Sequence, residues 1–290
     1  MNPIHLDTLL TIIDEGSFEN ASLALSISPS AVSQRIKALE KSVGRVLVSR
    51  TQPAVATEAG EVLVQAARKM ALLQAETREQ LAERLDEIPL TVAINADSLS
   101  TWFPPVFAEV AHWGAVTLTL RVEDEAHTLS LLRRGSVLGA VTREADPVAG
   151  CEVLRLGVMR HLPVATPELR ARYTVDGQPD WVRMPVLRFG PNDVLQDRDL
   201  EGRVDGAVAR RRVSVVPSAE GFGEAVRLGL GWGLLPEAQA APMLAAGDVV
   251  QLDEKVVDTP LYWQRWRLES RLLARLTDAV VDAARAGLRT

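Results

Sequence analysis

Side chains that can bond to nucleic acid lie along the stretch 28–43, SPSAVSQRIKALEKSV. Serine hydroxyls and a glutamine amide can exchange hydrogen bonds with the edges of base pairs, and glutamine can bond twice to adenine. Arginine and lysine suit guanine or the oxygens of phosphate groups. The candidate contact residues are Pro29, Ser30, Ser33, Gln34, Arg35, Lys37 and Arg50.

The charge of the chain is uneven. The whole sequence has a formal net charge of -6, yet residues 35–50 contain five basic residues and one acidic residue, Glu40. A focal basic patch on an acidic protein suits a small phosphate footprint better than a general attraction to nucleic acid. A solvated charged helix face is the alternative interpretation.

A second group of charged side chains follows two apolar runs. Asp97 comes shortly after LTVAI, and Glu123, Asp124 and Glu125 come directly after VTLTLRV. Ligands of α/β folds bind at the carboxyl ends of strands, where these acids could attract an ammonium or guanidinium group. If the second run stays extended, Glu123 and Glu125 point one way and Asp124 the other. Acids solvated in a loop are the alternative.

Further polar residues follow in the same region. Ser98, Ser100 and Thr101 could cap the next helix, whose free N–H groups and dipole favour a carboxylate, and capping alone is the alternative. The other candidate ligand-binding residues, beside or after predicted strands, are Trp102, Thr142, Phe189, Ser218 and Ala219.

Three short helices are predicted before residue 57. Apolar residues at helical spacing predict a first helix that stops at Gly16, and FENASLALSI predicts a second, brief one. Ser28 as N-cap and Pro29 at the first helical position begin the third, which ends at Gly44. RVLVSRTQPAVAT predicts two short extended pieces about a turn. Two helices joined by a tight turn, the second with a polar-basic face, form a helix-turn-helix.

A long helix is predicted over residues 57–88, which contain no proline and only Gly60 near the start. Apolar residues recur there in steps of three and four, which gives a seam for one partner helix. Such a helix is too long to bury its seam in the small domain before it, so pairing with a second subunit is favoured over packing inside one domain. The seam residues are Ala59, Leu63, Ala66, Met70, Leu73, Leu81, Leu85 and Ile88.

Strand-like and helical runs alternate after residue 89, which indicates parallel sheets flanked by helices. The expected fold class is a multidomain α+β chain. It has a winged helix-turn-helix at 1–57, a linker and dimerisation helix at 58–88, and a two-lobed α/β domain at 89–290. Lobe 1 takes about 89–160 and 262–290, and lobe 2 takes about 161–261. The chain is expected to cross between lobes near 159–163 and 259–262.

Composition and missing motifs exclude several classes of protein. No run of 18 apolar residues predicts a membrane span, and the N-terminus lacks the basic region of a signal peptide, so we expect a cytoplasmic protein. The single Cys151 is expected to be a small buried side chain. The four histidines lack metal-ligand spacing, and no nucleophile elbow, Walker loop or dinucleotide fingerprint is present. We expect no metal, no cofactor and no enzyme, with an effector-free DNA binder as the alternative regulator.

FENASLALSISPSAVSQRIKALEKSVGRVLVSRT, with TEAG shortly after it, resembles the N-terminal domain of LysR-type transcriptional regulators over residues 2–60. The matching features are an alanine-rich second helix, the recognition helix, the following glycine, the wing and the start of the linker. Two positions depart from the family pattern: Val48, where phenylalanine is usual, and Ala56, where leucine is usual. The rest of the chain resembles a periplasmic-binding-protein fold.

NADSLSTWFPP, VEDE, LRRGSVLGAVT and LYWQRW further resemble the basic-amino-acid-responsive branch of this family, the ArgP/LysG group. This resemblance implies an effector such as L-lysine, L-arginine or L-histidine between the lobes, and activation of an exporter gene for basic amino acids. It also implies a double-stranded DNA operator with dyad character, a homodimer or homotetramer built as a dimer of dimers, and contact with RNA polymerase.

Overall fold

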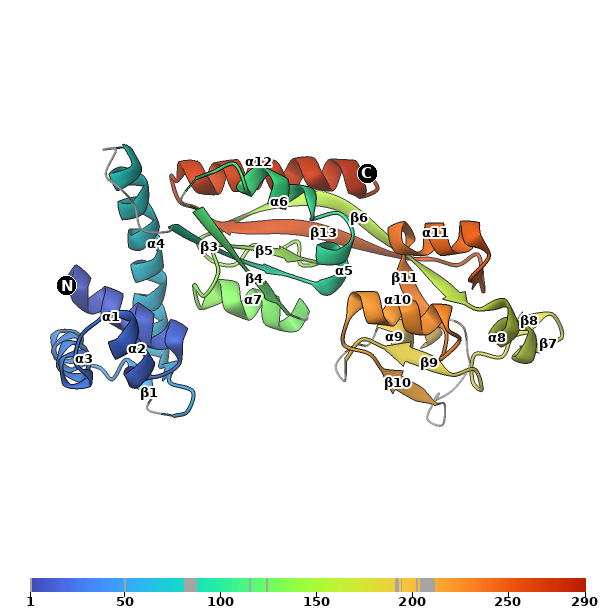
Figure 1. The fold of residues 1–290 in the computed structure, drawn as a ribbon, viewed down its shortest axis with the longest axis horizontal. Helices are drawn as coiled ribbons and strands as arrows, with labels where there is room; N and C mark the ends of the chain where they lie inside the picture. Colours follow the sequence, from blue (N-terminus) through green and yellow to red (C-terminus); the bar gives the residue numbers. More distant parts are fainter. Residues whose placement is uncertain are drawn as a thin grey trace.

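The computed structural model describes residues 2–49, 51–80, 88–114, 116–123, 125–190, 193, 195–201, 203 and 212–290. Three groups of elements follow one another along the long axis of the molecule (Figure 1). A small helical domain and the long helix α4 lie at one end. A lobe built on a sheet lies in the middle, and a second lobe lies at the other end.

The N-terminal domain consists of three short helices and a hairpin. Its elements are α1 (Pro3–Glu15), α2 (Phe18–Ala24), α3 (Pro29–Val43), β1 (Val48–Ser49) and β2 (Val55–Ala56). Leu9, Ala21 and Ile36, one from each helix, are buried together in its core. The predicted helix-turn-helix is confirmed, and β1 and β2 pair antiparallel as the two extended pieces about the turn.

The start and end of α3 follow from its sequence. The hydroxyl of Ser28 accepts a hydrogen bond from the N–H of Ala31 at 3.2 Å. Pro29 occupies the first turn, where its missing N–H costs no hydrogen bond. Gly44 ends the helix with a φ of 75°, a left-handed conformation that glycine adopts without strain. Both predicted boundaries of this helix are confirmed.

The two departures from the family pattern lie in the apolar core of the same domain. Val48 pairs with Ala56 across the hairpin and is 4% exposed. Ala56 is half-buried against the same core. Both positions stay apolar and packed, so the wing forms with these two side chains.

The linker helix differs from its predicted length. α4 runs over Glu58–Gln80, and residues 81–87, including Leu81 and Leu85, lie outside the described residues. Ile88, expected to end the helix, instead begins strand β3 (Ile88–Ile94). The expectation was wrong because the apolar run that starts at Ile88 pairs in a sheet, and Pro89 cannot continue a helix.

Part of the predicted seam of α4 packs against its own chain. Ala59 and Leu63 belong to the core of the N-terminal domain, which corrects their assignment to a partner helix. Met70 and Leu73, further along the helix, are 39% and 38% exposed. A partner helix could therefore contact the second half of α4.

Another face of α4 contacts the middle lobe of the same chain. The contacts are Glu61 with Arg134, Gln65 with the carbonyl of Arg133, Lys69 with the ring of Trp266, and Glu76 with Ser270 and the N–H of Leu272. We call Glu61, Gln65, Lys69 and Glu76 the docking face of α4. Their spacing of four or seven residues places them on one side of the helix.

A mixed sheet with the strand order β11-β6-β13-β5-β3-β4, in which β12 also pairs with β6, extends from the middle lobe into the second lobe, where β11 packs in the core of that lobe. Its strands are β3, β4 (Val116–Val122), β5 (Gly139–Thr142), β6 (Cys151–Ala165), β11 (Gly233–Pro236), β12 (Val250–Gln251) and β13 (Val257–Trp266). β3 runs parallel to β4 and β5, but β6, β11 and β13 pair antiparallel. The prediction of parallel sheets is thus corrected, because the two long strands run in opposite directions through the sheet.

Helices cover this sheet on both faces. α12 (Arg271–Gly287) and α6 (Pro105–Val110) share one apolar cluster with the sheet, and α7 (Glu125–Arg133) packs in another. In Figure 1, α12 and α6 lie on one side of the strands and α7 lies on the other.

The second lobe centres on a pair of tryptophans. The rings of Trp181 and Trp232 pack edge-on with centroids 4.9 Å apart, and both side chains are buried. β9 and β10 form a parallel pair. The elements are α8 (Pro167–Arg172), β7 (Thr174–Val175), β8 (Gln178–Pro179), β9 (Val186–Arg188), α9 (Leu195–Glu201), β10 (Val213–Val215), α10 (Ala219–Arg227) and α11 (Glu237–Ala246).

β6 and β13 run from the middle lobe to the second lobe (Figure 1). His161 lies opposite Val257 in their antiparallel register, so the expected crossings at 159–163 and 259–262 fall on paired strands. Arg160 donates two hydrogen bonds of 2.8 Å to Asp258, and this guanidinium lowers the pKa of the Asp258 carboxyl. Within the described residues, none of the helices has the length and apolar character to span a bilayer.

Candidate nucleic-acid interface and strand-end site

The outward face of α3 is polar and open. Ser30, Gln34 and Lys37 are exposed, and Ser33 is half-buried. Three apolar side chains on the opposite face are buried and fix the helix on the domain. This division is what a helix in the DNA major groove requires, because one side must pack while the other meets base edges.

Two of the predicted contact residues are arranged differently. Nη1 of Arg35 donates a hydrogen bond to the hydroxyl of Thr8 at 3.3 Å, so this guanidinium ties α3 to α1. Arg35 therefore does not lie on the exposed face of α3 with Ser30, Gln34 and Lys37. Pro29 is exposed at the start of the helix, and Arg50 lies outside the described residues.

Three parallel strands of the middle lobe end side by side. β3 and β4 are in register, and the N–H of Glu123 donates to the carbonyl of Ile94 at 3.2 Å. β5 ends at Thr142, which is buried and whose hydroxyl accepts a hydrogen bond from the N–H of Glu144 at 3.2 Å. Asp97 follows the end of β3. We call Asp97, Glu123 and Thr142 the strand-end site, because parallel strand ends share one sheet edge.

The helix after β3 is capped by a residue that the sequence analysis missed. Asn95 accepts a hydrogen bond from the N–H of Ser98 at 2.8 Å, so α5 (Ala96–Ser100) begins directly after the strand. Ser98 is buried inside the helix. The hydroxyls of Ser100 and Thr101 donate to the carbonyl of Asp97 at 3.2 and 2.6 Å. The expectation that these three residues cap the next helix is wrong.

Other predicted residues are also placed differently. Trp102 is 3% exposed and packs edge-on against Phe103 in the core of the lobe. β4 ends at Val122 and Glu125 begins α7, so the strand does not continue through the acids and the condition for Glu123 and Glu125 to point the same way is not met. Asp124 lies outside the described residues.

The predicted residues of the second lobe lie at matching strand ends. β9 and β10 are parallel, and the N–H of Phe189 donates to Asp193 at 2.9 Å just after β9. Ser218 caps α10 by accepting a hydrogen bond from the N–H of Gly221 at 3.2 Å, and Ala219 begins that helix. α10 approaches α5, so the two lobes meet close to the strand-end site.

His161 contacts the strand-end site, and the sequence analysis did not single it out. Its Nε2 lies 3.1 Å from Oδ2 of Asp97, and its side chain is 1% exposed. The signal was weak because a lone histidine in an apolar strand has the same pattern as a core residue. Only the fold brings β6 beside α5.

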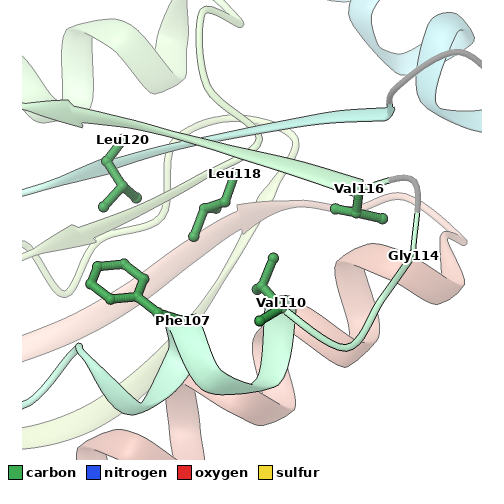
Figure 2. Close-up of a pocket in the computed structure, with 7 residues that line it drawn as sticks. Phe107, Val110, Gly114, Val116, Leu118 and Leu120 are labelled. Carbon is green, nitrogen blue, oxygen red and sulfur yellow. The ribbon is translucent and has the colours of Figure 1, made fainter.

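An apolar groove of about 290 Å³ lies apart from this site, between α6 and β4 (Figure 2). Its lining residues are Phe107, Val110, Ala111, Gly114, Val116, Leu118 and Leu120. β4 is at the end of the strand order of this sheet, so among the described strands only β3 pairs with it. Such a lining suits an apolar protein surface better than a charged small molecule. No cluster of possible metal ligands is found among the described residues.

Two family matches together cover nearly the whole chain. Residues 4–61 match the bacterial regulatory helix-turn-helix proteins of the lysR family, and residues 84–287 match the LysR substrate binding domain. The lysine export transcriptional regulatory protein LysG of Corynebacterium glutamicum is 82% identical over 289 residues, which covers 100% of both chains.

Two solved structures are similar over the full length. Full-length LysG from Corynebacterium glutamicum with bound effector Arg matches with a TM-score of 0.84 and 80% identity, and covers 100% of both chains. ArgP from Mycobacterium tuberculosis matches with a TM-score of 0.86 and 43% identity, and covers 98% of each chain. The order of domains described above is therefore that of solved full-length regulators.

Proposed function

Because this chain belongs to the lysR family of bacterial regulatory helix-turn-helix proteins, we propose that it senses a basic amino acid and activates an exporter gene for that amino acid. It is a DNA-binding transcriptional regulator and not an enzyme. The strand-end site is the proposed effector site, and L-lysine, L-arginine and L-histidine are the candidate effectors. The similar LysG structure from Corynebacterium glutamicum contains arginine as its effector, which supports this choice.

The acidic character of the strand-end site is the observation that carries the proposal. Asp97 and Glu123 follow adjacent strands, and the second lobe approaches from α10. Carboxylates form strong charge-assisted hydrogen bonds with ammonium and guanidinium groups. An effector that touches both lobes favours the arrangement in which they are close, by its difference in affinity for the two states.

Operator binding is assigned to α3. Ser30, Ser33 and Gln34 are the proposed base contacts and Lys37 is a proposed phosphate contact. Pro29 at the helix start and Arg50, which follows β1 in the sequence, are further proposed contacts. Paired subunits would place two copies of α3 on a double-stranded operator with dyad character. The proposed location is the cytoplasm, and RNA polymerase is the proposed partner in activation.

Assembly is proposed to use two apolar surfaces. The exposed Met70 and Leu73 of α4 support pairing of linker helices in a dimer. The groove between α6 and β4 supports a second contact through the lobes, which would allow a dimer of dimers. The proposed domains are 1–57, the linker from 58, and the regulatory domain, which starts at Ile88 with β3.

Titration calorimetry tests the effector proposal. The parent should bind L-arginine or L-lysine, and Asp97→Asn and Glu123→Gln should each weaken binding by about tenfold or more, because a hydrogen bond to a charged group contributes about 1.5–3 kcal/mol. Glu109→Gln, an exposed acid of α6 in the same lobe, is the matched control and should bind as the parent does. Unchanged affinity in both site variants would contradict the proposal.

A further inference from the structure

His161 has a buried side chain in a strand that is paired on both sides. Its backbone lies opposite Pro236 of β11 and Val257 of β13, which fixes the position of the residue. The imidazole is 1% exposed. Burying a polar ring costs free energy unless its nitrogen atoms are hydrogen-bonded, so the presence of a histidine at this buried position requires an explanation.

Asp97 provides one hydrogen-bond partner for this ring. Nε2 of His161 lies 3.1 Å from Oδ2 of Asp97, and a carboxylate oxygen can only accept, so Nε2 is the donor. Nδ1 is buried and has no partner among the described residues. The carboxylate of Asp97 is 34% exposed, and within the described part of the chain its Oδ1 makes no hydrogen bond.

We propose that His161 is a positioning residue for the effector, a role that rests on the function proposed above. By donating to Oδ2, His161 holds the carboxylate of Asp97 in one orientation and leaves Oδ1 for the cationic group of a basic amino acid. A carboxylate held by a second hydrogen bond loses less conformational entropy when a ligand binds.

The position of His161 also connects the effector to the strands between the lobes. Asp97 lies on α5 of the middle lobe, whereas His161 lies on β6 where that strand crosses to the second lobe. A cation on Asp97 is therefore one hydrogen bond away from the crossing. An apolar side chain could fill the same space without burying an unpaired nitrogen, which argues against packing as the whole reason for a histidine here.

Two variants of similar length separate the hydrogen bond from the packing. In His161→Gln the side-chain amide can replace Nε2 as donor, whereas His161→Met fills the space without a donor. By calorimetry, we expect His161→Met to weaken L-arginine and L-lysine binding by about tenfold, and His161→Gln to stay within about twofold of the parent. Citrulline, a neutral analogue of arginine, should bind both variants alike.

A double-mutant cycle completes the test. On an Asp97→Asn background, His161→Met should cause no further loss, because its effect acts through the carboxylate. Thermal unfolding of each variant reports on packing, and His161→Asn, whose amide is too short to reach Asp97, replaces the methionine variant if that protein does not fold.

The outcomes distinguish the two proposals. If the parent binds none of the basic amino acids, the proposed function fails and the role of His161 fails with it. If the parent binds them and all His161 variants bind equally well, or the glutamine variant loses as much as the methionine variant, the positioning role alone is overturned.

Discussion

At the scale of single residues, Cys151 shows how burial changes chemistry. The side chain is 1% exposed and packs in one cluster with Trp266. Burial raises the pKa of its thiol to about 11. Burial also lowers the pKa of Lys69, whose ammonium lies 3.6 Å from the centre of the Trp266 ring.

The thiol should therefore be unreactive in the folded protein. At pH 8 it is protonated and covered, and the thiolate is the species that reacts with alkylating agents. We expect iodoacetamide to modify Cys151 in guanidinium chloride but not under native conditions, as measured by intact mass. Ala171→Cys, at an exposed position of α8 and in a Cys151→Ala background, is the control and should react in both states. Rapid native modification of Cys151 would contradict the burial.

A second residue-scale prediction concerns Gln34. Because an amide can bond twice to adenine, Gln34→Ala should reduce discrimination between operator bases by about 1–3 kcal/mol. Lys37→Ala should instead weaken binding to all sequences alike and lower the salt dependence. Competition binding with point-substituted operators measures both. Identical base preferences in the parent and the Gln34 variant would contradict a contact between Gln34 and the bases.

Local signals made some residues predictable. The capping of α3 by Ser28 and its stop at Gly44 depend on neighbouring residues, so the sequence was sufficient to predict both. The inward turn of Arg35 and the contact between His161 and Asp97 depend on partners far along the chain. The local sequence does not indicate such distant partners, so these two contacts could not be predicted.

At the scale of elements, α4 and α12 are joined through one carboxylate. Glu76 is 7% exposed and accepts a hydrogen bond from the N–H of Leu272 at 2.9 Å, in the first turn of α12. A helix N-terminus has free N–H groups and favours negative charge. The linker helix thus provides a cap for a helix of the regulatory domain.

Removing this carboxylate should destabilise the protein. Glu76→Ala leaves a buried N–H unpaired, and we expect the free energy of unfolding to fall by about 2 kcal/mol. Denaturant unfolding measures the change, and Asp278→Ala, an exposed substitution on α12, should shift the free energy of unfolding by less than about 0.5 kcal/mol. Equal stability of the Glu76 variant and the parent would show that the cap contributes nothing.

Element types were easier to predict than their ends. The apolar periodicity of α4 was recognisable, but its end was misplaced because Ile88 pairs with Val116 of a distant strand. The start of α5 was also misplaced, because Asn95 and Ser98 are both able to cap and only the backbone geometry selects Asn95. Pairing with a distant strand determines where α4 must end, and the choice between two possible capping residues determines where α5 begins.

At the scale of the whole molecule, α4 offers an exposed apolar strip for a second copy of the chain. Met70→Glu together with Leu73→Glu should convert the proposed dimer to a monomer, because burying two unpaired carboxylates is strongly unfavourable. Light scattering after size-exclusion chromatography measures the mass in solution. Val175→Glu, at an exposed apolar residue of the second lobe, is the control and should leave the mass unchanged. A dimer that survives the double substitution would rule out pairing through this strip.

The two-lobed arrangement was predictable from alternating strands and helices, and the comparisons confirm it. The antiparallel course of β6 and β13 was not, because strand direction depends on long-range connection and not on local apolar pattern.

The docking face connects the linker helix rigidly to the middle lobe. One end of α4 lies in the core of the N-terminal domain, and its side is bonded to the middle lobe as far as Glu76. This helix of 23 residues is about 35 Å long, and the lobe contacts it from Glu61 in its first turn to Glu76, so we expect the helix and the lobe to move as one body. In the proposed dimer, a rotation of the lobe would then be passed directly to the N-terminal domain and would alter the spacing of two α3 helices along a duplex.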